Sequence, residues 1–156
     1  MKKQSFEDQD FELWVLLHQT RDAIFRARDK ELGQYGISTM QAGVLFIINA
    51  IGNEATPTEV ARWLFREPHT VSSLLNRMER DGLVSKTKDL QKKNMVRVTL
   101  TEKGRSAYNE SLKRKSINKV MTSLSEEERL QFRSYLEKLR DRALTEPGRE
   151  MKLPFP

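Results

Sequence analysis

The stretch of residues 56–104 constrains the fold most, because its start and stop signals follow one another in a short, fixed order. Thr56, Pro57 and Glu59 form a helix start that combines a capping side chain, a preset φ and an acid at the third helical position. A break at residues 66–67 follows this short helix before the next apolar pattern begins. The order therefore predicts a short helix, a tight turn and a second helix.

The second helix, expected over residues 68–81, has two unlike faces. Its apolar residues recur at the spacing i, i+3, i+4, i+7, which predicts one buried face. These residues are Val71, Leu74, Leu75 and Met78. The rest of the surface carries short polar and basic side chains, namely His69, Thr70, Ser72, Ser73, Asn76, Arg77 and Arg80. Gly82 is expected to end this helix.

A β-hairpin is expected directly after it. Residues 83–88 form one arm, and residues 95–100 form the other, in which valines alternate with polar or larger residues. The connecting loop, residues 89–94, is polar and carries Lys92 and Lys93 near its tip. A short helix, an amphipathic helix and a hairpin with a basic tip together predict a winged helix-turn-helix.

The remaining chain is predicted to be helical. Capping boxes begin helices at Ser38 and Ser125, and Thr101 caps another. The fold class is therefore mainly α with a small β-hairpin wing, with six helices expected over residues 6–32, 39–51, 57–65, 68–81, 102–123 and 126–146. Four regions follow from this layout: N-terminal helices (1–55), the winged region (56–104), C-terminal helices (105–146) and an irregular tail (147–156).

Charge is concentrated in the winged region. Of the net charge of +6, residues 56–105 contribute +5, from 11 basic and 6 acidic residues. A helix fits the major groove of DNA, while cations beside it hold phosphates. The polar face of the helix over 68–81 is therefore a candidate for reading bases, with backbone or wing contacts from Arg66, Lys86, Lys88, Lys92, Lys93 and Asn94. A merely solvated, uneven surface is the alternative interpretation.

Three segments resemble the multiple-antibiotic-resistance regulator (MarR) family of bacterial transcription factors: residues 56–64, 70–84 and 98–104. The resemblance implies a homodimer whose N-terminal and last helices form a dimerisation platform. It also implies binding to a pseudo-palindromic operator, most simply as a repressor. The wing departs from the family's pattern of two Asp and an Arg: Asp89 matches the first Asp, but Lys92 and Asn94 replace the others.

A candidate effector pocket combines aromatic side chains with one cation. Proteins that resemble this one bind small aromatic acids between the platform and the winged region, and a cation beside aromatic rings suits an anionic aromatic ligand. The residues are Trp14, His18, Arg21, Phe25 and Phe46. The alternative is that the aromatic residues are core or dimer interface and that Arg21 is a surface charge.

Composition excludes several other functions. The chain has no cysteine and two histidines, so thiol chemistry and thiolate metal sites are ruled out, and no metal or cofactor is expected. No catalytic motif stands out, so an enzyme is not expected. The acidic start and the short apolar runs predict a cytoplasmic protein with no membrane partner. A binding module for protein or for non-specific nucleic acid is the competing hypothesis, and sequence preference would distinguish the two.

Overall fold

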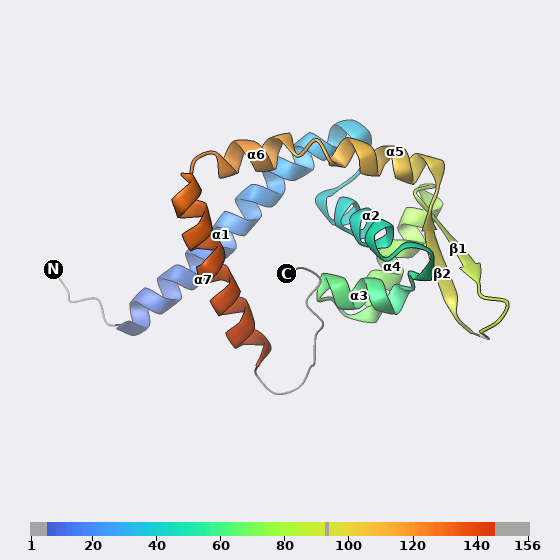
Figure 1. The fold of residues 1–156 in the computed structure, drawn as a ribbon, viewed down its shortest axis with the longest axis horizontal. Helices are drawn as coiled ribbons and strands as arrows, with labels where there is room; N and C mark the ends of the chain where they lie inside the picture. The colour runs from blue at the N-terminus through green and yellow to red at the C-terminus, as the bar shows by residue number, and fades with distance from the viewer. Residues whose placement is uncertain (1–5, 93, 146–156) are drawn as a thin grey trace.

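The computed structural model describes residues 6–92 and 94–145, which form two lobes (Figure 1). The first lobe, called here the platform, contains α1 (Phe6–Leu32), α6 (Lys115–Met121) and α7 (Glu126–Leu144). The second, the winged lobe, contains α2 to α4 and the hairpin. Helix α5 (Glu102–Ser111) packs against α2, and α6 packs against α1, so the chain enters the winged lobe between α1 and α2 and returns to the platform between α5 and α6.

The winged lobe follows the predicted order of elements. It contains α2 (Thr39–Ile51), α3 (Pro57–Leu64), α4 (Pro68–Arg80), β1 (Val84–Lys88) and β2 (Val96–Leu100), with short 3-10 turns at Gly33–Tyr35 and Gly52–Glu54. The strands are antiparallel, with Val84 opposite Leu100 and Lys88 opposite Val96. The Val98 amide also donates a hydrogen bond to the Ala55 carbonyl at 2.9 Å, which ties the hairpin to the segment before α3.

The predicted helix starts are confirmed. Ser38 and Ser125 each form a complete capping box, with the side chain three residues later bonded back to the cap amide. The hydroxyls of Thr56 and Thr101 accept bonds from the amides of Glu59 and Gly104. These caps satisfy amides that the first turn of a helix leaves without partners. The predicted fold class, mainly helical with a two-stranded wing, is also confirmed.

The hydrophobic core lies in the winged lobe. Val71, Leu75 and Met78 of α4 are buried, and Leu74 packs against them at the edge. They meet buried residues of α2 and of the hairpin, among them Leu45 and Val98. The predicted buried face of α4 is therefore confirmed. Because this face is buried, the polar face of α4 points outwards.

The helix expected as one piece over residues 102–123 is divided. Helix α5 ends at Ser111 and α6 begins at Lys115, and Arg114 between them has the left-handed φ of 50°. That conformation is uncommon for a residue with a side chain. No Gly or Pro marks residues 112–114, so local sequence signals predicted continuity, and tertiary contacts described below supply the break.

Within the described residues, no single helix is long and apolar enough to cross a membrane, although a pair bent by 75° (Asp8–Tyr35 with Thr39–Glu54) passes that test together on length and composition alone. The helix expected over residues 126–146 ends earlier, at Leu144, with Thr145 as its C-cap. Pro147 and Gly148, the residues expected to end it, and the expected irregular tail 147–156 lie outside the described residues.

Candidate nucleic-acid interface

Helix α4 presents the polar face that the sequence predicted. Its candidate base-reading side chains are all exposed: His69, Thr70, Ser72, Ser73, Asn76, Arg77 and Arg80. The packing of the opposite face on the core fixes the orientation of the helix. Short polar side chains on a fixed, exposed helix can approach base edges closely, and the two arginines add bidentate donors.

Two of these side chains already have partners within the protein. The Ser73 hydroxyl donates to the His69 carbonyl at 3.1 Å, and the Asn76 amide oxygen accepts a hydrogen bond from the Lys86 ammonium. The Lys86 backbone amide donates to the Glu79 carboxylate at 2.8 Å. Lys86, expected to contact phosphate, thus also connects β1 to α4, so the wing and the polar face of α4 are held in one arrangement.

A set of ion pairs among Asp89, Arg97 and Glu54, called here the clamp, holds the wing loop. The Asp89 carboxylate accepts hydrogen bonds from the amides of Gln91 (2.8 Å) and Lys92 (3.2 Å), and from the Arg97 guanidinium (3.1 Å). Arg97 also pairs with the Glu54 carboxylate at 2.9 Å. The Gln91 amide, followed by the Lys92 amide and Arg97, lowers the pKa of Asp89 against the opposing effect of desolvation. The loop is therefore preorganised by an ionised carboxylate.

The tip of the wing is a left-handed turn. Asn94 has a φ of 71°, a conformation that Asn adopts more readily than most residues because its short side chain can bond locally. Asn94 therefore fits the turn. Lys92 is exposed beside it, while Lys93, also expected to contact DNA, lies outside the described residues.

The remaining expected phosphate contacts flank α4. Arg66 is exposed in the turn between α3 and α4, where its amide donates to the Ala61 carbonyl at 3.1 Å. Lys88 is exposed at the end of β1. The structure thus places exposed cations both before α4 and at the end of the first hairpin strand.

Sequence reasoning missed the residues that hold these elements. Arg97 and Glu54 support the wing, and Arg28 and Glu31 connect α1 to the α5–α6 break. The sequence does show Arg97 on the outward side of its strand, but nothing local assigns its partners, since Glu54 lies 43 residues away. Hydrogen bonds across such separations leave no periodic signal in the sequence.

The candidate effector residues are divided between two helices. On α1, the Trp14 and His18 rings are 4.4 Å apart between centroids, and the Arg21 guanidinium lies 4.3 Å from the Phe25 ring centroid. Phe46 is half-buried on α2 and packs against the core. Trp14 also lines a cavity of about 780 Å³ between α1 and α7, opposite Tyr135. Among the described residues, no group of His, Asp or Glu side chains could hold a metal ion.

Comparison with known proteins identifies the class. Residues 35–93 match the model of the MarR family. The organohalide-sensing RdhR-CbdbA1625 transcriptional regulator, in its 2,4-dichlorophenol-bound form, is 34% identical, with a TM-score of 0.88 over 100% of this chain and 96% of that one. The chain belongs to the MarR family of transcription regulators, as its sequence predicted, and is therefore a regulator and not an enzyme.

Other similar proteins have a lower sequence identity. The S. aureus MepR–DNA complex is 25% identical, with a TM-score of 0.76 over 83% of this chain and 96% of that one. E. coli MarR in complex with operator DNA is 20% identical, with a TM-score of 0.79 over 87% and 99%. The transcriptional activatory protein BadR of Rhodopseudomonas palustris is 26% identical over 98 residues, which are 62% of this chain and 56%, little over half, of BadR.

Proposed function

We propose that this regulator is a homodimeric repressor that binds a pseudo-palindromic DNA operator and is released by a small aromatic effector. The observation that carries the DNA-binding role is helix α4, which is buried on one face and polar on the other, and is connected to a preorganised wing. The MepR and MarR structures with this fold contain DNA, which supports the same role here.

In this proposal α4 enters the major groove and the wing lies beside it. His69 and Thr70 at the start of α4 would approach bases first, since base contacts concentrate there in such helices. Ser72, Ser73, Asn76, Arg77 and Arg80 complete the reading face. Arg66, Lys86, Lys88, Lys92 and Lys93 would neutralise phosphates, and Asn94 would shape the wing tip. Two copies of α4 would occupy grooves about 10 bp apart.

The platform supports the homodimer. Helix α7 buries none of its 19 residues, although most of the stability of a helix in a protein comes from the packing of its apolar face. Helices α1 and α7 also leave a set of large apolar side chains exposed, namely Phe11, Leu13, Trp14, Leu16, Leu17, Leu130, Phe132, Tyr135, Leu136 and Leu139. A patch of this kind marks an interaction surface. A second copy, bringing the same patch, would cover it, as in the family.

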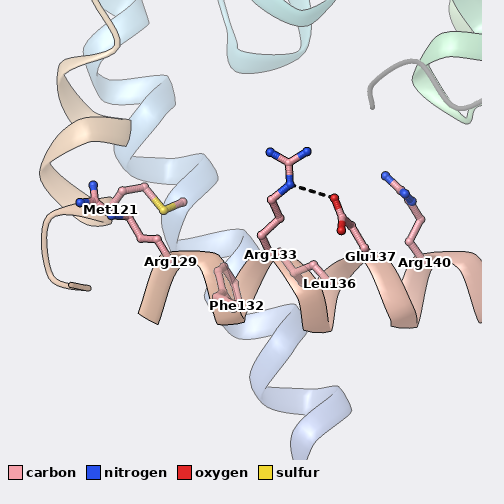
Figure 2. A pocket seen from close by; sticks show the side chains of 7 residues that line it. All are labelled: Met121, Arg129, Phe132, Arg133, Leu136, Glu137 and Arg140. Carbon is pink, nitrogen blue, oxygen red and sulfur yellow. Dashed lines mark hydrogen bonds and ion pairs between the residues drawn. The ribbon is translucent and has the colours of Figure 1, made fainter. Parts of the chain in front are cut away.

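The exposed side of α7 combines apolar and charged groups (Figure 2). Phe132 and Leu136 lie in a hollow with Met121 at the end of α6, and three arginines border it. Arg133 pairs with Glu137 at 2.9 Å. An apolar centre with a polar border is the usual anatomy of a protein interface. We therefore assign this hollow, with α1, α6 and the rest of α7, to the dimerisation platform.

The effector site would lie in the platform, on α1. The cavity between α1 and α7 is lined by Trp14, Leu17, Tyr135 and other apolar side chains, and Arg21 lies two turns from Trp14 along the same helix. The similar regulator crystallised with 2,4-dichlorophenol supports an aromatic ligand. Such a ligand would release DNA by binding one arrangement of the two winged lobes better than the other.

Selection of bound fragments from random DNA tests the proposal, with non-specific competitor present at physiological salt. Recovery of a pseudo-palindrome with half-sites one helical turn apart is the expected result. Recovery of no motif by active, dimeric protein would overturn it and favour a non-specific binding module. Transcription from a template that carries the selected site then tests repression, since the relative BadR is named an activatory protein.

A further inference from the structure

A buried ion pair lies at the C-terminal end of α1, away from the DNA-binding face. Arg28 and Glu31 are 2.9 Å apart, and each side chain is only 9% exposed. Taking two charges out of water is costly unless further hydrogen bonds satisfy them. The partners of this pair therefore show what the pair holds in place.

Those partners lie on both sides of the break between α5 and α6. The Arg28 guanidinium donates to the Ser111 carbonyl, at the last residue of α5, at 2.6 Å. The Glu31 carboxylate accepts hydrogen bonds from the amides of Lys115 (2.8 Å) and Ser116 (3.0 Å), the first two residues of α6. The Ser116 hydroxyl also donates to Glu31. One ion pair thus holds the end of one helix and the start of the next.

Glu31 takes the place of a local helix cap. The N-cap residue of α6, Arg114, is left-handed and makes no side-chain capping bond. The first amides of a helix need acceptors, and a carboxylate there is also favoured by the helix dipole. Glu31, which lies 84 residues earlier in the chain, supplies both the acceptor and the negative charge.

The charge of Glu31 is strongly stabilised. Desolvation by burial raises its pKa, but the bonds from the Ser116 hydroxyl and amide, from Arg28 and from the Lys115 amide outweigh it and lower the pKa from 4.5 to about 2. The carboxylate is therefore ionised throughout the physiological pH range, so a change of pH within that range does not switch this contact.

The break is also one of the two places where the lobes join; at the other, between α1 and α2, the Thr39 amide donates a hydrogen bond to the Asp29 carboxylate at 2.7 Å. Helix α5 packs on α2 of the winged lobe, whereas α6 packs on α1 of the platform. A change in angle at residues 112–114 would therefore swing the winged lobe, with α4, relative to the platform. In a dimer this angle determines the distance between the two α4 helices.

We propose that Arg28 and Glu31 are positioning residues, which fix the angle of the α5–α6 joint and so determine the operator spacing that the dimer accepts. This inference rests on the proposed dimeric, DNA-binding function. Neither residue touches DNA in it. They act by making one separation of the two α4 helices much more stable than the others.

The first test measures the distance between the two winged lobes of the dimer in the absence of DNA. The chain has no cysteine, so Thr58→Cys places a single spin label on exposed α3 of each protomer. Dipolar spectroscopy on the labelled dimer should give one narrow distance distribution. Glu31→Gln, which removes the ion pair and one acceptor, should broaden or shift it. Glu102→Gln makes the same charge change at an exposed site on α5 and should not.

The second test measures the affinity of the protein for DNA, with the selected operator as the probe. Affinities are compared between this duplex and duplexes with one base pair added or removed between the half-sites. The ratio cancels the uniform effect of a changed net charge. Glu31→Gln and Arg28→Met should lower the preference for the native spacing by about 3- to 30-fold.

Milder variants guard against misfolding. Ser116→Ala removes one donor to Glu31, whereas Ser123→Ala removes an exposed hydroxyl that bonds only to the nearby Val120 carbonyl. Only Ser116→Ala should alter the distance between the labels and the preference for the native half-site spacing. Folded variants with lower melting temperatures but unchanged distances and ratios would overturn the positioning role. A wild type that gives no distance between protomers, or no operator, would instead overturn the proposed function, and this inference with it.

Discussion

The winged lobe and the platform use apolar residues in opposite ways. In the winged lobe the apolar face of α4 is covered within the same chain, and side chains such as Leu75 are fully buried. In the platform, α7 has comparable leucines, but Leu130 remains 65% exposed. An apolar pattern along a helix therefore predicts that one face will be buried. It does not predict whether that face is buried by the same chain or by a second one.

The largest effect is expected from a charge in the middle of the platform. Leu136→Asp would bury an unpaired carboxylate in the dimer, which is costly. We expect the dimer to dissociate at least about 100-fold more readily, measured by sedimentation or light scattering across protein concentrations. Leu90→Asp is the matched control, because Leu90 is 99% exposed on the wing. A Leu136→Asp protein that stays dimeric at micromolar concentration would contradict our placement of the platform.

A cavity in the winged lobe should lower stability itself. Leu75→Ala should reduce the free energy of unfolding by about 2–5 kcal/mol, because the surrounding core closes only partly around the lost atoms. Chemical denaturation measures this free energy at a protein concentration where both the wild type and the variant are dimeric. Leu74→Ala, at the edge of the same core, should cost less. Equal losses would mean that the two positions are covered to the same extent.

Acid should weaken the contact that joins the two lobes. Because the folded pKa of Glu31 is lowered to about 2, its stabilisation is complete above the ordinary value of 4.5 and is lost as the pH falls towards 2. Between these pH values wild type should lose about 2–3 kcal/mol more unfolding free energy than Glu31→Gln. Parallel pH profiles of the two proteins would show that Glu31 is not held in its charged form.

Removal of a base-reading side chain should affect binding but not folding. Arg77→Ala should cost about 1–3 kcal/mol of operator affinity and relax the preference at one position in each half-site, because a bidentate contact to a base is lost. Competition with single-base operator variants measures this. A uniform loss on every sequence would assign Arg77 to a phosphate.

The smallest expected effect concerns the wing. Lys92→Ala with Lys93→Ala should weaken binding on all sequences and lower the slope of log affinity against log salt by about 0.9 per lost phosphate contact. Titrations at several salt concentrations measure the slope. An unchanged slope would remove the wing's lysines from the interface and leave α4 as the main contact.

The sequence by itself determined the elements whose signals are local. The caps at Ser38, Thr56 and Ser125, the two faces of α4 and the alternation in the hairpin each lie within one helical turn or one strand, so spacing alone reveals them. The resemblance to the MarR family was confirmed by a family match over residues 35–93, which contains two of its three segments, 56–64 and 70–84. The roles of individual α4 and wing residues stay predictions.

Only the tertiary structure decided how these elements are held together. The Arg28–Glu31 pair bonds to residues 83 to 85 positions away and so supports a helix break that local propensity does not predict. The Asp89–Arg97–Glu54 clamp likewise supports the loop of the wing. Such contacts depend on where separate helices and strands meet in space. Periodicity along one helix or strand contains no information about that meeting.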